Sequence, residues 1–270
     1  MAVDTRNGKL VGEIPGMQRI HGIALVPQLR RGYVSDGNAN AVHVIDLATL
    51  KTLRSIAIDG KRPDAIVYDP ASGHVLTMNG GSDNATVIDP ATSKTLTNVA
   101  LPGRPEFAVS DGRGHVYANI EDRNELARIN STTDKVDAVW PLAPCESPTG
   151  LAIDTTARRL FSVCANHRMV VTDAGDGHHV ASVPIGKGPD GAVFDPATQM
   201  VYSSNHDGTL TVVHADDANH YRVVANVPTQ VGARTMTLDR ATHDIWLVAA
   251  TPAPRGAPVT GFTALVVGSR

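Results

Sequence analysis

Short apolar stretches alternate with polar turns along the whole chain, and these stretches recur at a nearly fixed interval. Successive units begin 43, 42, 43, 41 and 44 residues apart, at the positions His21, Asp64, Glu106, Thr149, Asp190 and Arg234. Apolar runs of about four to eight residues bounded by turn residues are typical of β-strands, and no segment shows the period of an amphipathic helix. The pattern therefore predicts six copies of one β-rich unit.

Each unit contains four short strands. A first apolar strand leads into a turn of the Asp-Pro type, and a second strand, such as residues 75–78 or 201–204, ends in a turn rich in Gly and Asn before the third and fourth strands. Four strands in about 40–45 residues is the size of a β-propeller blade. We therefore expect an all-β chain that forms a single β-propeller domain over residues 1–270, with six four-stranded blades.

The turns carry most of the aspartates. Asp followed by Pro, Ala and Thr or Ser suits a type I turn, in which the Asp side chain accepts hydrogen bonds from the backbone just ahead. This sequence occurs at Asp69, Asp89 and Asp195, with looser copies at Asp46, Asp154, Asp173 and Asp239. We therefore expect these seven aspartates to be structural rather than catalytic.

The two ends of the chain predict how the propeller closes. Asp4 precedes His21 by 17 residues, and the same distance separates the third-strand turn residue Asp89 from Glu106. Residues 1–4 should thus end a third strand and residues 9–14 should form a fourth. The last unit has strands after Arg234, at 245–248 and at 262–267, with a Pro-rich insertion at 252–258 and no fourth strand. We expect the N-terminal strand to complete this last blade and so remove two open edges.

The strand and turn sequences resemble the YncE-like, YVTN-repeat family of bacterial β-propellers. The resemblance rests on Gly32-Tyr33-Val34-Ser35 with Ala41-Val42-His43-Val44-Ile45-Asp46, on Val201-Tyr202-Ser203-Ser204-Asn205 with Gly208-Thr209-Leu210-Thr211-Val212-Val213, and on Arg62-Pro63, Arg104-Pro105 and Gly188-Pro189. It implies a periplasmic or secreted protein, usually with seven blades and an export signal. The chain differs because it has six first strands and starts with Met1 inside a blade, as a shortened or engineered chain, a natural six-bladed relative or a fragment would.

Composition and charge exclude several functions. The chain carries 24 Lys and Arg against 27 Asp and Glu, for a net charge of −3, and it has 11 aromatic residues without a basic stripe. Single-stranded nucleic acid needs a basic groove with stacking aromatics, so we expect no nucleic-acid partner. No apolar run approaches the ~18 residues that cross a bilayer, and residues 1–20 lack the pattern of a signal peptide. We expect a monomer without a membrane span.

The candidate binding residues are those that open each first strand. In propellers of this strand order the first strands line the central channel, so their starts should surround the channel mouth. These residues, with a histidine that follows a second strand, are His21, Asp64, Glu106, Thr149, Asp190, Arg234 and His206. Carboxylate and imidazole ligands suit a divalent cation, and His21, Asp64, Glu106 and Asp190 are the candidate ligands. Polar residues in a water-filled channel also need no ligand at all.

A second group of polar residues follows the second strands on the same face. Asn is common there, which a left-handed turn conformation would explain. His167 and His206 with His21 are a candidate three-histidine set. Cys145 and Cys164 should lie near the same end of one hairpin, where either a disulfide, typical of an oxidising compartment, or two buried thiols would fit.

These observations leave three functions open. The first is a binding or interaction scaffold that presents the polar channel mouth to a small molecule, a metal ion or a partner protein. The second is a metal-dependent enzyme of the lactonase or lyase type, in which a cation polarises a carbonyl and a nearby His or carboxylate moves the proton. The third is a structural or engineered propeller without activity. No serine-hydrolase, zinc-protease or phosphate-loop motif is present, so no nucleophile can be named.

Overall fold

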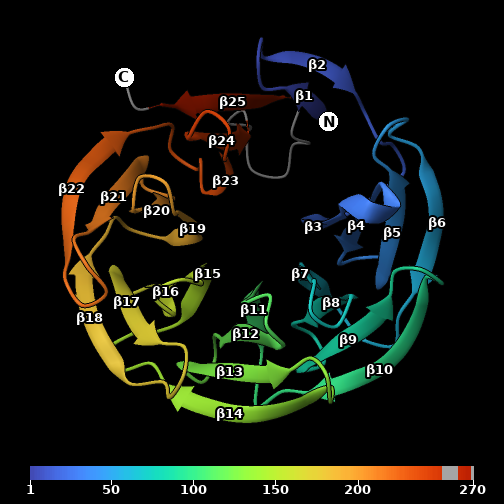
Figure 1. The fold of residues 1–270 in the computed structure, drawn as a ribbon. Helices are drawn as coiled ribbons and strands as arrows, with labels where there is room; N and C mark the ends of the chain where they lie inside the picture. Colours follow the sequence, from blue (N-terminus) through green and yellow to red (C-terminus); the bar gives the residue numbers. More distant parts are fainter. Residues whose placement is uncertain (251–260, 269–270) are drawn as a thin grey trace. The chain divides into compact units, whose positions relative to one another are not determined.

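The fold is an all-β propeller of six blades, as the repeat predicts. A computed structural model describes residues 1–250 and 261–268, in which the regular elements are the strands β1 to β25 and one 3-10 turn, η1 (Figure 1). The contacts divide the chain into two compact units, residues 1–139 and 140–270, and each is described by itself. That the six blades form one domain stays a prediction.

The first unit holds a hairpin and blades 1 to 3. The hairpin consists of β1 (Ala2–Asp4) and β2 (Lys9–Gly12). Blade 1 consists of β3 (Ile20–Val26), η1 (Pro27–Leu29), β4 (Arg31–Asp36), β5 (Ala41–Asp46) and β6 (Thr52–Ala57). Blade 2 consists of β7 (Pro63–Asp69), β8 (His74–Asn79), β9 (Asn84–Asp89) and β10 (Lys94–Ala100). Blade 3 consists of β11 (Pro105–Ser110), β12 (His115–Ile120), β13 (Glu125–Asn130) and β14 (Lys135–Pro141), whose last residues belong to the second unit.

The second unit holds blades 4 to 6. Blade 4 consists of β15 (Pro148–Asp154), β16 (Arg159–Cys164), β17 (Arg168–Asp173) and β18 (His179–Pro184). Blade 5 consists of β19 (Pro189–Asp195), β20 (Met200–Asn205), β21 (Thr209–Ala215) and β22 (Tyr221–Pro228). Blade 6 consists of β23 (Thr235–Asp239), β24 (Asp244–Ala250) and β25 (Phe262–Val267). The strands of each blade are antiparallel and neighbour each other in chain order.

The strand positions agree closely with the sequence pattern. The six first strands begin within one residue of the predicted starts, and the predicted hairpin at the N-terminus is present with Val3 opposite Leu10. Blade 6 has three strands among the described residues, and β1 pairs with β2. Completion of blade 6 by the N-terminal strand therefore stays a prediction. The Pro-rich insertion at 252–258 lies outside the described residues.

Neighbouring blades pack face to face through the apolar side chains of their inner strands. In the first unit, Leu76 and Met78 of blade 2 share one buried cluster with Val116 and Ala118 of blade 3. In the second unit, Phe161 of blade 4 and Phe194 of blade 5 belong to one cluster, and their ring centroids lie 5.6 Å apart. Burial of this apolar surface between blades is the main stabilising contribution.

The Asp-Pro turns have the structural role that the sequence predicts. The Asp69 carboxylate accepts a hydrogen bond from the Ser72 backbone at 2.9 Å, and Asp89 and Asp195 accept equivalent bonds from their own turns. Two of them also reach the next blade. Asp69 accepts hydrogen bonds from the hydroxyls of Ser110 and Ser131, both at 2.6 Å. Asp195 lies 2.9 Å from Nδ1 of His243. These aspartates therefore join blades as well as shape turns.

Hydroxyl groups also fasten one blade to the start of the next first strand. The Ser35 hydroxyl donates to the backbone carbonyl of Asp64, and the Ser204 hydroxyl donates to that of Arg234. In blade 4 the Thr149 hydroxyl donates to the Pro189 carbonyl at 2.9 Å. Each of these contacts uses the backbone of the receiving residue rather than its side chain.

Candidate functional site

Six of the seven predicted site residues lie at the starts of first strands, and the seventh, His206, directly follows β20. His21, Asp64 and Glu106 are the second residues of β3, β7 and β11 in the first unit. Thr149 and Asp190 are the second residues of β15 and β19 in the second unit, and Arg234 immediately precedes β23.

In the first unit the structure brings His21 and Asp64 together. Nδ1 of His21 lies 3.2 Å from Oδ1 of Asp64, across the boundary between blades 1 and 2. The two side chains are 26% and 32% exposed, so a solute can reach both. The imidazole lies beside the backbone of Gly37, where a Cβ would be 3.3 Å from its ring. The pair thus has one accessible basic group and one accessible acidic group.

The second unit contains a pair of the same kind between blades 5 and 6. Nε of Arg234 lies 3.5 Å from Oδ2 of Asp190, and the side chains are 53% and 32% exposed. Thr149 differs, because its hydroxyl donates to the carbonyls of Pro189 and Val163 and so contributes to the packing of blades 4 and 5. The arrangement therefore repeats a paired acid and base at two blade boundaries.

His206 lies in an exposed turn that fastens two loops. Its backbone N–H donates to the Gly188 carbonyl at 2.9 Å, and its carbonyl accepts from the Gly232 N–H at 2.9 Å. His167 is exposed too, and it adopts a left-handed φ of 62° in the turn after β16. The set of His21, His167 and His206 stays a prediction.

The explanation given for the Asn residues after the second strands is wrong. Asn79 and Asn205 are fully buried at the ends of β8 and β20, and the left-handed turn residues follow later, at positions such as Asn40 and Asn124. Nδ2 of Asn205 donates to the hydroxyls of Thr209 and Thr211, which crosslinks the second and third strands. These amides are therefore structural, because each ties a strand end to its neighbour from inside the blade.

Asp36 occupies the same position in blade 1 and holds the loop that leads into the blade. Its carboxylate accepts backbone hydrogen bonds from Gln18 at 2.8 Å and from Arg19 and Ala39 at 3.2 Å, and it lies 3.2 Å from Nε2 of His43. Burial by itself would raise the pKa of Asp36, but these hydrogen bonds outweigh it and lower the pKa to about 2. The charged form of Asp36 therefore stabilises the fold.

We expect Asp36→Asn to lower the free energy of unfolding at pH 7 by about 2 kcal/mol, the linkage value of a pKa depressed from 3.8 to about 2. A depressed pKa stabilises above the unfolded-state value, and the contribution disappears as the pH falls from about 4 through 2. Urea unfolding of both proteins across this range checks the prediction. Asp59→Asn, the same change at an exposed aspartate, is the control. A difference between wild type and Asp36→Asn that stays constant with pH would contradict it.

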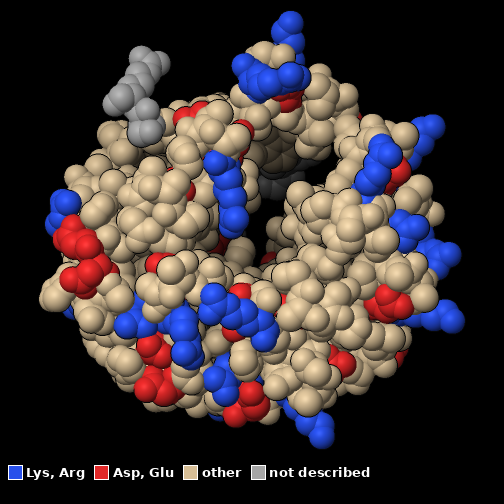
Figure 2. Space-filling view, viewed as in Figure 1, with Lys and Arg blue, Asp and Glu red and all other residues tan. Residues whose placement is uncertain are grey.

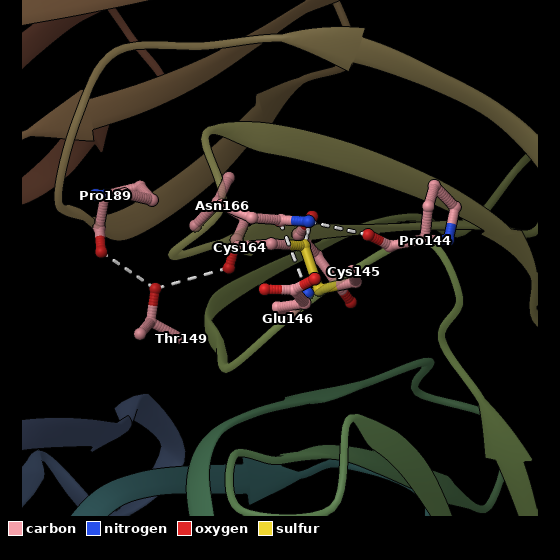
Figure 3. Close-up of a disulfide and its surroundings, with 9 residues drawn as sticks. Pro144, Cys145, Glu146, Thr149, Cys164, Asn166 and Pro189 are labelled. Atoms are coloured by element: carbon pink, nitrogen blue, oxygen red, sulfur yellow. Dashed lines mark hydrogen bonds between the residues drawn. A yellow bond between two sulfur atoms is a disulfide. The ribbon is translucent and has the colours of Figure 1, made fainter.

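Blade 4 uses a disulfide where blade 1 uses Asp36. Cys145, in the loop before β15, is bonded to Cys164 at the end of β16, so of the two arrangements that the sequence allowed the disulfide is the one present (Figure 3). Both cysteines are buried. Asn166 reinforces the link, since its Nδ2 donates to the Pro144 carbonyl at 2.7 Å and its Oδ1 accepts from the Glu146 N–H. The loops that precede these two first strands are thus anchored by a carboxylate in blade 1 and by a disulfide together with an amide in blade 4.

Two groups of residues outside the predicted site have side chains that could bind an ion: a cluster of acidic and histidine side chains, and a cavity lined by two arginines. Asp173, Asp176 and His178 place their ligand atoms within 4.8 Å of one another, but Asp173 is already paired with Arg159 and the other two are exposed. The second is a cavity beside Arg31 and Arg54. The three residues of the cluster belong to a single turn, whereas the cavity is lined by β4, β5, β6 and the turn after β9, which no local motif reveals.

No helix among the described residues is long and apolar enough to cross a membrane. The surface carries both acidic and basic side chains (Figure 2). Figure 2 shows Lys and Arg interspersed with Asp and Glu over the viewed face. This distribution agrees with the small net charge of −3.

Comparisons with known proteins support the fold. No protein-family model matches the chain, and no curated protein matches it. Among solved structures, hydrazine synthase from Kuenenia stuttgartiensis is similar, with a TM-score of 0.72 and 14% sequence identity over 90% of this chain and 80% of that one. A likeness at this identity shows the fold alone, because one fold serves many activities. The YVTN-repeat resemblance stays a prediction.

Proposed function

We propose that the protein is a monomeric binding scaffold of the YncE-like type, which recognises a polar small molecule or partner protein at the starts of its first strands. The observation that carries the proposal is the pairing of an accessible acid with an accessible base at two blade boundaries, His21 with Asp64 and Asp190 with Arg234. Glu106, Thr149 and His206 are the further candidate contacts.

Paired charges favour recognition of a ligand that carries both signs. A cation bound by Asp64 or Asp190 would have to displace a basic side chain that already lies within 4 Å of the carboxylate. A zwitterion would instead place its ammonium group near the carboxylate and its carboxylate near the imidazole or guanidinium, with charge-assisted hydrogen bonds on both sides. The geometry therefore favours binding of a polar ligand over Lewis-acid catalysis with these residues as metal ligands.

We further propose that the protein works in the periplasm or outside the cell. The disulfide between Cys145 and Cys164 supports this, because disulfides persist mainly in oxidising compartments. The resemblance to YVTN-repeat propellers supports the same location. Thiol titration of the protein isolated from its native cell, under denaturing and non-reducing conditions, should find no free thiol, and two free thiols would contradict the proposal.

The binding proposal is tested by NMR titration with a panel of amino acids and dipeptides as zwitterionic probes. We expect shifts of the backbone amides around residues 20–22, 63–65, 190 and 234, with affinity reduced about tenfold in Asp64→Asn or Asp190→Asn, the loss of one charge-assisted contact. Asp176→Asn, at an exposed turn, is the matched control. The absence of shifts at all of these amides would overturn the proposal. Lactone hydrolysis that requires Ca²⁺ or Zn²⁺ and is lost in the same variants would favour the metal-dependent enzyme instead.

A further inference from the structure

A cavity of about 270 Å³ lies in the first unit, between the face of blade 1 and the turn that joins β9 to β10 of blade 2. Its lining residues are Arg31, Val44, Leu53, Arg54, Ala91, Thr92 and Ser93. It is distinct from the His21 and Asp64 pair, because Arg31 is opposite Val26 at the far end of β3, whereas His21 is near its start. The sequence repeat does not predict this cavity.

The pairing of the strands in blade 1 explains why two arginines meet there. Val44 of β5 is opposite both Tyr33 of β4 and Arg54 of β6, so these side chains share one face of the sheet. Arg31 precedes Tyr33 by two residues and therefore lies on the same face. A register shift next to Val44 leaves Leu53 as an extra residue, which is 53% exposed at the rim.

The turn of blade 2 forms the opposite wall and is fixed by hydrogen bonds from blade 1. The Tyr33 hydroxyl donates to the Pro90 carbonyl at 2.7 Å, and Nη1 of Arg31 donates to the same carbonyl at 3.2 Å. Nη1 of Arg54 donates to the Thr92 carbonyl at 3.4 Å. The cavity is thus a built feature, with both guanidinium groups held against one wall.

Both guanidinium groups keep unused donors. Each has five N–H groups, and the carbonyls that they contact do not neutralise their charge. Among the described residues no carboxylate lies within 4 Å of the nitrogens of Arg31 or Arg54. The carboxylates of the two adjacent turns bond within their own turns, Asp46 to Thr49 and Asp89 to Ala91 and Thr92. Within residues 1–250 and 261–268, neither of the two positive charges at the cavity therefore has an ion-pair partner.

We propose that this cavity binds a phosphate or sulfate group carried by a small, partly apolar molecule. Arginine recognises such oxyanions through several N–H donors in a planar fork, and two arginines supply enough charge for a dianion. Val44, Leu53 and Ala91 provide an apolar wall for a short carbon substituent. The volume is just below that of typical small-molecule pockets, so the ligand is a single small ester rather than a nucleotide.

The experiment is calorimetric titration of the whole chain in a buffer free of oxyanions, with inorganic phosphate, sulfate, phenyl phosphate and benzoate as probes. We expect phenyl phosphate to bind most tightly, and Arg31→Gln and Arg54→Gln each to weaken it by about tenfold or more, the value of a charge-assisted contact. Arg113→Gln, at an exposed arginine of blade 3, makes the same charge change outside the cavity and should leave binding unchanged.

A second variant separates loss of the site from loss of folding. Leu53→Glu places a carboxylate at the rim, where it pairs with the two arginines, so we expect it to abolish phenyl phosphate binding while the melting temperature stays the same or rises. Equal affinity in Arg54→Gln and Arg113→Gln would overturn the proposal. Tighter binding of benzoate than of phenyl phosphate would overturn the assignment to phosphate or sulfate, and so would unchanged binding in Leu53→Glu.

Discussion

Replacing Gly150 by alanine should lower the free energy of unfolding by about 3 kcal/mol, the upper part of the range for overpacked sites. A Cβ at this position would lie 2.6 Å from the carbonyl oxygen of Asp190 and 2.8 Å from the backbone nitrogen of Ala192. Both atoms belong to the inner strand of blade 5, which cannot move away without separating from its own blade. Urea unfolding followed by circular dichroism measures the loss.

The matched control is Gly22→Ala, at the same position of the first strand in blade 1. Here a Cβ would lie 3.2 Å from the Ile66 side chain and 3.3 Å from its backbone nitrogen, so a small adjustment accommodates it. Blade 2 already has alanine at the equivalent position, Ala65. We expect this variant to unfold within about 1 kcal/mol of wild type, as a tight but relaxable contact does. Equal losses in the two variants would show that the blade boundaries are not packed as described.

Removing the disulfide with Cys145→Ala and Cys164→Ala together should also lower the free energy of unfolding by about 3 kcal/mol. The two cysteines are 19 residues apart, and crosslinking a loop of that length restricts the unfolded chain by about this amount. Both positions are buried, and alanine is chosen because its side chain has no polar atom that would be left unpaired there. The measurement is urea unfolding of the oxidised protein and of the double variant.

Reduction of the wild-type protein supplies the control for this prediction. Wild type treated with a thiol reductant should approach the stability of the double variant, and the variant itself should not respond to the reductant. Because Cys164 anchors the loop of residues 142–147, the double variant should exchange the amides of this loop faster than wild type does. The increase should be larger there than elsewhere in blade 4. A double variant as stable as oxidised wild type would show that Asn166 alone holds the loop.

The sequence was sufficient to predict the fold because the repeat is local. The blades repeat similar turn residues at a nearly constant spacing, and a turn such as that at Asp69 is determined by the few residues around it. The starts of the first strands followed from this spacing to within one residue. The Pro-rich insertion at 252–258 interrupts this spacing in the last unit.

The candidate site was predicted in part, because the repeat determines where each residue lies in its blade but not which side chain it contacts. Spacing placed His21 and Asp64 at equivalent positions, yet it could not say that they face each other across a blade boundary at 3.2 Å. The buried Asn79 was assigned to a turn because composition alone cannot distinguish an amide inside a strand end from one in a turn. The Arg31 and Arg54 cavity depends on a one-residue register shift in β6, which no sequence period reveals.

The hydroxyl contacts between blades depend on the backbone of the receiving residues and not on their side chains. Ser35 and Ser204 hold the backbone carbonyls of Asp64 and Arg234, and the side chains of those two residues take no part in the bond. Asp64 and Arg234 thus each join two blades through the backbone carbonyl, while their side chains are accessible to solvent. If these residues bind a ligand as proposed, substitutions of their side chains would change which ligand is recognised, while the hydroxyl contacts that join the blades would stay in place.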